Sequence, residues 1–283
     1  MFLFSSWLSL AILNGFTSNG FNFLSRYILK GKDDATAYAW FTQLIRCVVF
    51  GIIAIFDWHL LLTPQSILMF VLLGLSEGIS IYFYMKMHAA SHLSISAILS
   101  RTRLIWVPIL GFFILHEGLT IVDYIGIIII FFGVSTTIAP NKIFMDKGAL
   151  YANISAFTIA VNIILTKLAL PFASNSVINI FITLPSVLIF PFLMKQPKER
   201  IINIVHHNFL LKLVAVGLNI LGLGLFIAAL RIGDASKVNA VYQGMMIFSV
   251  LAGIVFLHER ENIARKLIGA TVTVIGVVLL SFS

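Results

Sequence analysis

Four ionisable side chains lie within long apolar segments of the chain, where charge is costly. They are Arg46, Glu77, Arg101 and Arg103. A charged side chain at the centre of a membrane-spanning helix costs about 2.5–3.5 kcal/mol on insertion scales, so it usually faces a partner or a water-filled cavity. Three arginines against one glutamate leave an excess of positive charge. Because a guanidinium pairs bidentately with carboxylate or phosphate, this excess favours a solute with an anionic or zwitterionic group, such as an amino acid or an organic acid.

Amide side chains on the same kind of segment add polar groups without charge. Asn22 shares a helical face with Ser18 in the first apolar segment, and Asn162 shares one with Thr158 in the sixth. Each amide alone is explained by an interhelical hydrogen bond, which contributes about 0.6 kcal/mol on average. Together with the buried arginines, the amides favour a water-accessible cavity that these residues line.

The segments that carry these residues have the composition of membrane-spanning helices. Of the 283 residues, 60% are hydrophobic and 11% are charged, whereas a soluble domain carries about 25% charged residues. A soluble enzyme and a nucleic-acid-binding protein are therefore excluded. We expect an all-α membrane protein with ten transmembrane helices, because a span needs about 20 apolar residues. The expected helices are 3–25, 37–57, 65–84, 92–115, 121–139, 148–169, 175–194, 209–230, 235–257 and 263–282.

The chain also repeats itself. Residues 111–117 (Gly-Phe-Phe-Ile-Leu-His-Glu) match 253–259 (Gly-Ile-Val-Phe-Leu-His-Glu) at an offset of 142, and Ile-Gly and Gly-Val at 125–126 and 133–134 recur at 268–269 and 276–277. The repeat predicts two five-helix halves, 1–140 and 141–283. Since five is odd, the second half enters the membrane from the opposite face, and the repeats are inverted around a central cavity. Inverted repeats are typical of secondary transporters; a duplication that only built a stable bundle is the alternative.

The repeat helps to choose among the buried charges. Arg101 corresponds to Gln243, and Ala97 corresponds to Asn239, one turn earlier on the same helical face as Gln243. Residues related by a two-fold axis approach that axis together, so we expect Arg101 and Gln243 to meet at the centre, with Asn239 and the neighbouring Tyr242 beside them. Arg103 is about 200° around the helix from Arg101. We expect Arg103 to pair with Glu77 or to extend to the membrane interface.

The repeated motif itself favours structural roles. The glycines at 126, 133, 269 and 276 lie seven apart on their helices, where small residues let backbones approach closely. Glu117 and Glu259 are expected to stabilise the N-termini of the helices that follow them through the helix dipole. Thr120 and Asp123 have the spacing of a capping box. A proton-coupling role for the two glutamates is the alternative.

The sequence resembles the EamA family of the drug/metabolite transporter superfamily. The two copies of Gly-x5-Glu, the Ile-Gly and Gly-Val that follow each, Pro108 and the five-plus-five layout carry the resemblance. It implies a cavity lined mainly by the first four helices of each half, with the fifth of each at the periphery. Family members move amino acids, metabolites, drugs or nucleotide-linked compounds, and many are exporters. His116 and His258 stand where the family often has glycine, and Val250 replaces Pro108 in the second half.

We therefore interpret the chain as a secondary transporter, an exporter or exchanger working by alternating access in the plasma (inner) membrane. A lipid flippase or a non-transporting assembly partner is the alternative; we expect no enzyme, cofactor, metal site or nucleic-acid partner. Counter-transport of a proton or solute, and a monomer or homodimer, stay open. The loops on one face carry 13 Lys and Arg and the other face 3. The positive-inside rule then places both termini outside, whereas the resemblance suggests inside.

Overall fold

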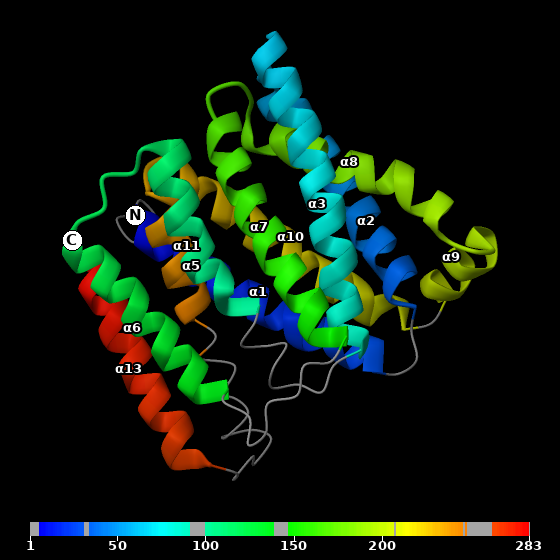
Figure 1. Cartoon of the computed structure of the whole chain (residues 1–283). Helices are drawn as coiled ribbons and strands as arrows, with labels where there is room; N and C mark the ends of the chain where they lie inside the picture. The colour runs from blue at the N-terminus through cyan, green and yellow to red at the C-terminus, as the bar shows by residue number, and fades with distance from the viewer. Residues whose placement is uncertain are drawn as a thin grey trace.

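The computed structural model describes residues 6–30, 34–90, 100–138, 147–206, 208–245, 247 and 262–282. Within these ranges the chain is a bundle of helices (Figure 1), and its one strand-like pairing is an isolated bridge between Leu60 and Ala173. The helices are α1 (Trp7–Lys30), α2 (Ala35–Asp57), α3 (Pro64–Ala90), η2 (Ser100–Thr102), α5 (Arg103–Leu110), η3 (Gly111–Leu115), α6 (Ile121–Ile138), α7 (Lys147–Ala169), α8 (Asn175–Leu193), α9 (Pro197–His206), α10 (Phe209–Ile232), α11 (Ala235–Gly244) and α13 (Ile263–Ser281).

Most of these helices begin and end within a few residues of the predicted bounds. The expected helix 92–115 differs, because its described part is a 3-10 turn (η2), a short α-helix that contains Pro108 (α5) and a π-helical turn (η3). Proline removes a backbone donor and breaks the regular ladder, which accounts for the interruption. Of the expected helix 235–257, α11 ends at Gly244, and residues 246 and 248–257 lie outside the described residues.

Helix α9 was not predicted. It is too short to span a bilayer, and it lies at the edge of the bundle (Figure 1), where it packs on α2 and α10. Proline at its first position and an acid in its first turn are the usual start signals. Arg200 of α9 forms an ion pair with Asp34, the residue that caps the N-terminus of α2. The ion pair therefore fixes α9 against the connection between α1 and α2.

Six of the described helices are long and apolar enough to cross a membrane by length and composition. They lie in α2, α3, α7, α8, α10 and α13, and the stretches 103–115 and 121–136 are shorter apolar helices. Large apolar side chains such as Phe56 and Phe192 are exposed on the outside of the bundle. An exposed apolar surface of this kind is suited to contact with lipid, so the chain is a multi-pass membrane protein.

Equivalent helices of the two predicted halves pack against each other. Helices α6 and α13 lie side by side (Figure 1), and their glycines allow the close approach. A Cβ added at Gly133 would lie 2.8 Å from the carbonyl oxygen of Gly269, and one added at Gly276 would lie 2.8 Å from that of Gly126. The contacts follow the two helices in opposite order, so α6 and α13 run antiparallel.

The second helices of the halves, α2 and α8, show the same relation. Trp40 Nε1 donates a hydrogen bond to the carbonyl oxygen of Val187 at 3.1 Å. Near the other end of α2, Ser176 Oγ donates to Asp57 Oδ2 at 2.8 Å. These contacts again occur in reverse order along the partner. The other main contacts are those of α1 with α10 and of α3 with α7. If the two predicted halves are interchanged, α1 is replaced by α7 and α10 by α3, so each of these contacts becomes the other.

Candidate functional site

Arg101 and Gln243 meet in the interior of the bundle. Arg101 Nη1 donates a hydrogen bond to Gln243 Oε1 at 2.8 Å, and the two residues are 142 positions apart, the offset of the repeat. Arg101 is 8% exposed and Gln243 is 1% exposed. Two residues at equivalent positions of the sequence repeat are therefore in direct contact.

The position of Arg103 differs from the one that the sequence predicts. It neither pairs with Glu77 nor extends to the interface; it is 7% exposed, and its guanidinium carbon lies 4.9 Å from the ring centroid of Tyr242. Tyr242 interacts electrostatically with both Arg101 and Arg103, so the two arginines share one environment. The reason is packing. The segment η2–α5 lies between α7 and α11, so side chains on opposite faces of it both stay inside the protein.

A second phenol completes this group of side chains. Tyr84 of α3, like Tyr242 and Arg103, interacts electrostatically with Arg101. Tyr84 Oη donates a hydrogen bond of 2.5 Å to Asn22 Oδ1, which brings α1 into the same region. We call Arg101, Arg103, Tyr84, Tyr242 and Gln243 the arginine cluster. It draws residues from α3, η2, α5 and α11, and hence from both halves of the chain.

Two amides beside the cluster have polar atoms without a partner in the described part of the chain. Asn239 is fully buried, and neither its Oδ1 nor its Nδ2 forms a hydrogen bond there; the same holds for Gln243 Nε2. An unsatisfied buried polar group costs about 1–3 kcal/mol. Since Asn239 is one turn from Gln243 on α11, its amide lies on the face that points toward Arg101. Water or a solute would satisfy these atoms.

The other sequence candidates lie in separate contacts. Arg46 Nη1 forms an ion pair with Glu77 Oε1 at 2.8 Å, and Gln43 Nε2 donates to the same oxygen at 3.0 Å. Asn162 Nδ2 donates to Leu73 O at 3.2 Å and to Ser76 Oγ at 3.1 Å, which ties α7 to α3. None of these bonds reaches the arginine cluster. The structure thus brings Asn22, Arg101, Asn239, Tyr242 and Gln243 together, but not Arg46, Glu77 and Asn162.

Glu117 stabilises a helix other than the expected one. Its carboxylate accepts hydrogen bonds from Ala235 N at 2.5 Å and from Ser236 N and Oγ at 3.3 and 2.5 Å, at the N-terminus of α11. The glutamate therefore caps a helix of the other half instead of α6, which follows it. Gly111 is required for this approach, because a Cβ there would lie 2.6 Å from Glu117 Oε2. Glu259, the second copy, lies outside the described residues.

The expected capping box at the start of α6 is present. Thr120 N donates to Asp123 Oδ2 at 2.8 Å, and Asp123 N donates to Thr120 Oγ1 at 3.2 Å. Asp123 Oδ1 also lies 3.0 Å from Lys237 Nζ on α11. With the Glu117 contacts, this ion pair fixes the N-terminal turn of α11 against the first half of the chain.

Comparison with known proteins identifies the family. The sequence profile of the EamA-like transporter family matches residues 5–139 and, a second time, residues 146–282. The chain belongs to this family. One solved structure, described as "Crystal structure of protein", is similar to this EamA-like chain with a TM-score of 0.70 and 14% identity, and covers 96% of each chain. At that identity the likeness concerns the fold. No curated protein matches the chain.

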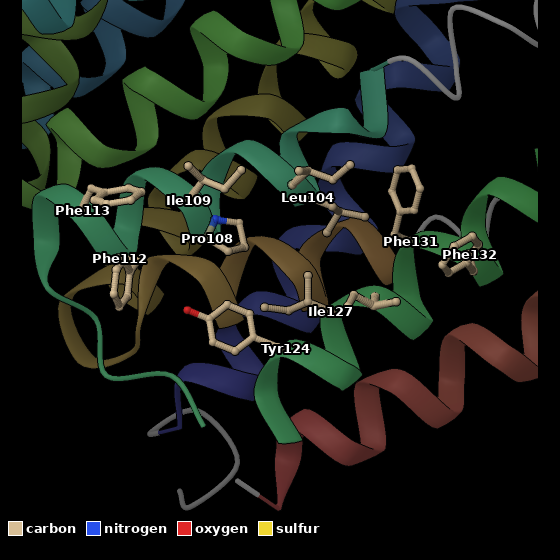
Figure 2. A pocket seen from close by; sticks show the side chains of 11 residues that line it. Leu104, Pro108, Ile109, Phe112, Phe113, Tyr124, Ile127, Phe131 and Phe132 are labelled. Carbon is tan, nitrogen blue, oxygen red and sulfur yellow. The ribbon is translucent and has the colours of Figure 1, made fainter. Parts of the chain in front are cut away.

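The EamA-like chain also has an apolar groove on its outer surface (Figure 2). The groove has a volume of about 460 Å³ and lies between α5–η3 and α6. Its lining is Leu104, Ile105, Pro108, Ile109, Phe112, Phe113, Tyr124, Ile127, Ile128, Phe131 and Phe132. Apart from the phenol of Tyr124, no side chain of the groove carries a polar group. The groove suits an apolar chain and offers nothing to a charged headgroup.

One short pattern in the sequence resembles a catalytic motif. Residues 74–78 (Gly-Leu-Ser-Glu-Gly) have the spacing of the nucleophile motif of hydrolases, which requires a strand–turn–helix geometry. Here they lie inside the continuous helix α3, and Ser76 Oγ donates to Leu73 O at 2.9 Å. Among the described residues, no group of three or more His, Cys, Asp or Glu comes together as metal ligands.

Proposed function

We propose that the chain is a secondary transporter, an exporter or exchanger, that moves a small anionic or zwitterionic solute such as an amino acid or organic acid across the plasma membrane by alternating access. One observation carries the proposal: Arg101 forms a hydrogen bond with Gln243, its equivalent in the sequence repeat, beside a second buried arginine. Buried charge is costly, and it is kept in membrane proteins where solutes or ions bind.

The proposal includes two inverted five-helix repeats, residues 1–140 and 141–283, with ten spans in all. The antiparallel packing of α2 with α8 and of α6 with α13 supports this arrangement. The contact between α5 and α11 belongs to the same pattern, since Arg101 meets Gln243 whereas Gly111, further along the chain, meets Ser236. In an inverted pair, the solute site lies near the midplane between the repeats.

The contacts of α11 suggest how access alternates. The Arg101–Gln243 bond lies along the α5–α11 contact, and the Glu117–Ser236 bond closes one end of it. Opening that end breaks the bonds to Glu117 and exposes the arginine cluster to one side of the membrane. A solute bound at the cluster shifts the equilibrium between the closed and the opened state by the difference between its affinities for the two states. Alternation then amounts to rocking of one repeat against the other.

A lipid flippase is less well supported. The apolar groove accommodates an acyl chain, but a flippase must also carry a polar headgroup across, and the groove has a single phenol. Glu77 lies within an expected span, but it is engaged by Arg46 and Gln43, which favours a structural role over proton coupling.

Flux into proteoliposomes tests the proposal. We expect the purified protein to move at least one solute from a panel of amino acids, organic acids and nucleotide sugars faster than empty liposomes do. Arg101→Ala should abolish that flux while expression is kept, and Arg103→Ala should reduce it as well. Lys198→Ala, which removes an exposed charge on α9 at the edge of the bundle, is the control and should transport normally. If no solute crosses faster than in empty liposomes, the proposal fails.

A further inference from the structure

The described acids of the chain have partners or places away from the arginine cluster. Asp34 pairs with Arg200, Glu77 with Arg46, and Asp123 with Lys237; Asp57 accepts from Ser176, Glu117 caps α11, Asp234 precedes α11, and Glu199 is exposed on α9. Arg103 has no carboxylate within ion-pair distance among the described residues. Its contact is the face of the Tyr242 ring. Among the described residues, the guanidinium of Arg103 therefore has no carboxylate that neutralises it.

Two neighbouring cations in a buried site determine what else can enter it. Arg101 and Arg103 repel each other, and such repulsion is strong in a low-dielectric interior. An oxyanion neutralises both guanidinium groups and accepts their hydrogen bonds. An ammonium group would be a third positive charge, and the remaining neighbours among the described residues are phenols and amides. The site therefore distinguishes an anion from a zwitterion.

The uncharged neighbours provide the rest of the site. The ring of Tyr242 lies 5.7 Å from that of Phe226, so an aromatic surface borders Arg103. On α11, Asn239 Oδ1 and Nδ2 and Gln243 Nε2 have no hydrogen-bond partner among the described residues. An apolar or aromatic body fits against the rings, and a hydroxyl group, which both donates and accepts, fits the amides.

We propose that the solute is an organic anion without an amino group, whose carboxylate or phosphate lies between Arg101 and Arg103 and whose body lies against Tyr242. This inference rests on the proposed transport function, because it specifies the solute. It excludes the amino acids that the excess of arginine alone leaves open.

Matched pairs of ligands that differ by one amino group provide the test. The pairs are 3-phenylpropionate with phenylalanine, succinate with aspartate, and ethyl phosphate with phosphoethanolamine. Binding to the purified full-length protein in detergent is measured by calorimetry. We expect at least one amino-free member to bind more than tenfold tighter than its partner, and the three pairs separate carboxylate from phosphate. Amino-bearing members that bind as tightly as their partners, or no binding by any amino-free member, would overturn the inference.

Arginine variants link binding to the cluster. Arg103→Gln should weaken binding of the preferred anion more than tenfold, and Arg103→Lys, which keeps the charge but not the planar fork, should weaken it less. Lys198→Gln, which changes an exposed charge on α9, should bind like the wild type. Unchanged affinity in Arg103→Gln would overturn the assignment; if this variant does not fold, the ligand pairs on the wild type still decide. Arginine-dependent binding without flux contradicts the transport proposal alone, whereas flux of amino acids only contradicts this inference alone.

Discussion

Replacing Glu117 with alanine should loosen the two halves of the molecule where α11 begins. The carboxylate is 7% exposed and accepts two hydrogen bonds of 2.5 Å, from Ala235 N and Ser236 Oγ. Each hydrogen bond to a charged group contributes about 1.5–3 kcal/mol. Taking the lower value for the two short bonds, we expect a loss of about 3 kcal/mol, which is roughly a hundredfold in an equilibrium constant. Glu117→Gln keeps one acceptor oxygen and should lose less.

Two measurements check this expectation. The first is the free energy of unfolding in mixed detergent, which should fall in the order wild type, Glu117→Gln, Glu117→Ala. The second is the labelling rate of a cysteine placed at Asn239, in a background without Cys47, by a membrane-impermeant maleimide. If the α5–α11 contact opens before labelling, Glu117→Ala should raise that rate about a hundredfold. Glu199→Ala, an exposed acid on α9, is the control.

The reasoning would be refuted by an alanine variant that unfolds like the wild type and keeps the cysteine protected. Loss of stability without a change in labelling would mean that Glu117 supports α11 but does not control access. The two measurements thus distinguish a residue that only stabilises α11 from one that also controls access to the arginine cluster.

Three further outcomes are expected. Arg46→Ala should destabilise the protein by about 3–5 kcal/mol, because it leaves Glu77 buried without its cation, and Arg46→Met with Glu77→Met should recover most of that loss in the same unfolding assay. Gly276→Ala should cost about 1–3 kcal/mol, since its Cβ would lie 2.8 Å from a backbone oxygen of α6. Asp34→Asn should destabilise the protein at neutral pH but not at low pH. Burial raises the pKa of Asp34, but Arg200 and the helix amides outweigh it and hold the pKa below its usual value. The bond to Arg200 therefore stabilises the fold above the usual Asp pKa and is lost as the pH falls through the lowered pKa, so unfolding curves of variant and wild type should converge in acid.

Controls for these three changes come from the chain itself. Gly217 lies on α10 with nothing within 4 Å of an added Cβ, so Gly217→Ala should leave stability unchanged or raise it slightly. A Gly276→Ala variant as stable as Gly217→Ala would contradict the close packing of α6 and α13. If the double methionine variant is no more stable than Arg46→Ala, the loss does not come from an uncompensated charge. An equal effect of Asp34→Asn at every pH would contradict the lowered pKa of Asp34.

The repeat allowed part of the site to be predicted from sequence. An offset of 142 pairs Arg101 with Gln243, and a two-fold relation requires that residues near its axis meet. The approximate bounds of most described helices also followed from the length of the apolar runs, because a spanning helix needs about 20 apolar residues. These predictions required no knowledge of side-chain packing.

Other contacts could not be predicted, because they depend on what surrounds a helix. Arg103 was assigned away from Arg101 on the assumption that one face of the helix is buried, whereas η2–α5 has protein on both sides. The residues that bind Glu117, Ala235 and Ser236, lie 118 and 119 positions further along the chain. Spacing in the sequence indicates only the helix that directly follows Glu117. Helix α9 has only ten residues, so apolar segments of spanning length do not predict it.

The difference between residues 101 and 243, which are equivalent in the sequence repeat, has a physical reason. A perfect repeat would place arginine opposite arginine at 101 and 243, and two buried guanidinium groups in contact would repel each other. Glutamine at 243 instead accepts a hydrogen bond from Arg101 and keeps an amide donor for a further partner. By contrast, the glycines between α6 and α13 are the same in both halves, since both backbones need the same clearance. The glycines at the α6–α13 contact are thus the same in both copies of the repeat, whereas residues 101 and 243 differ.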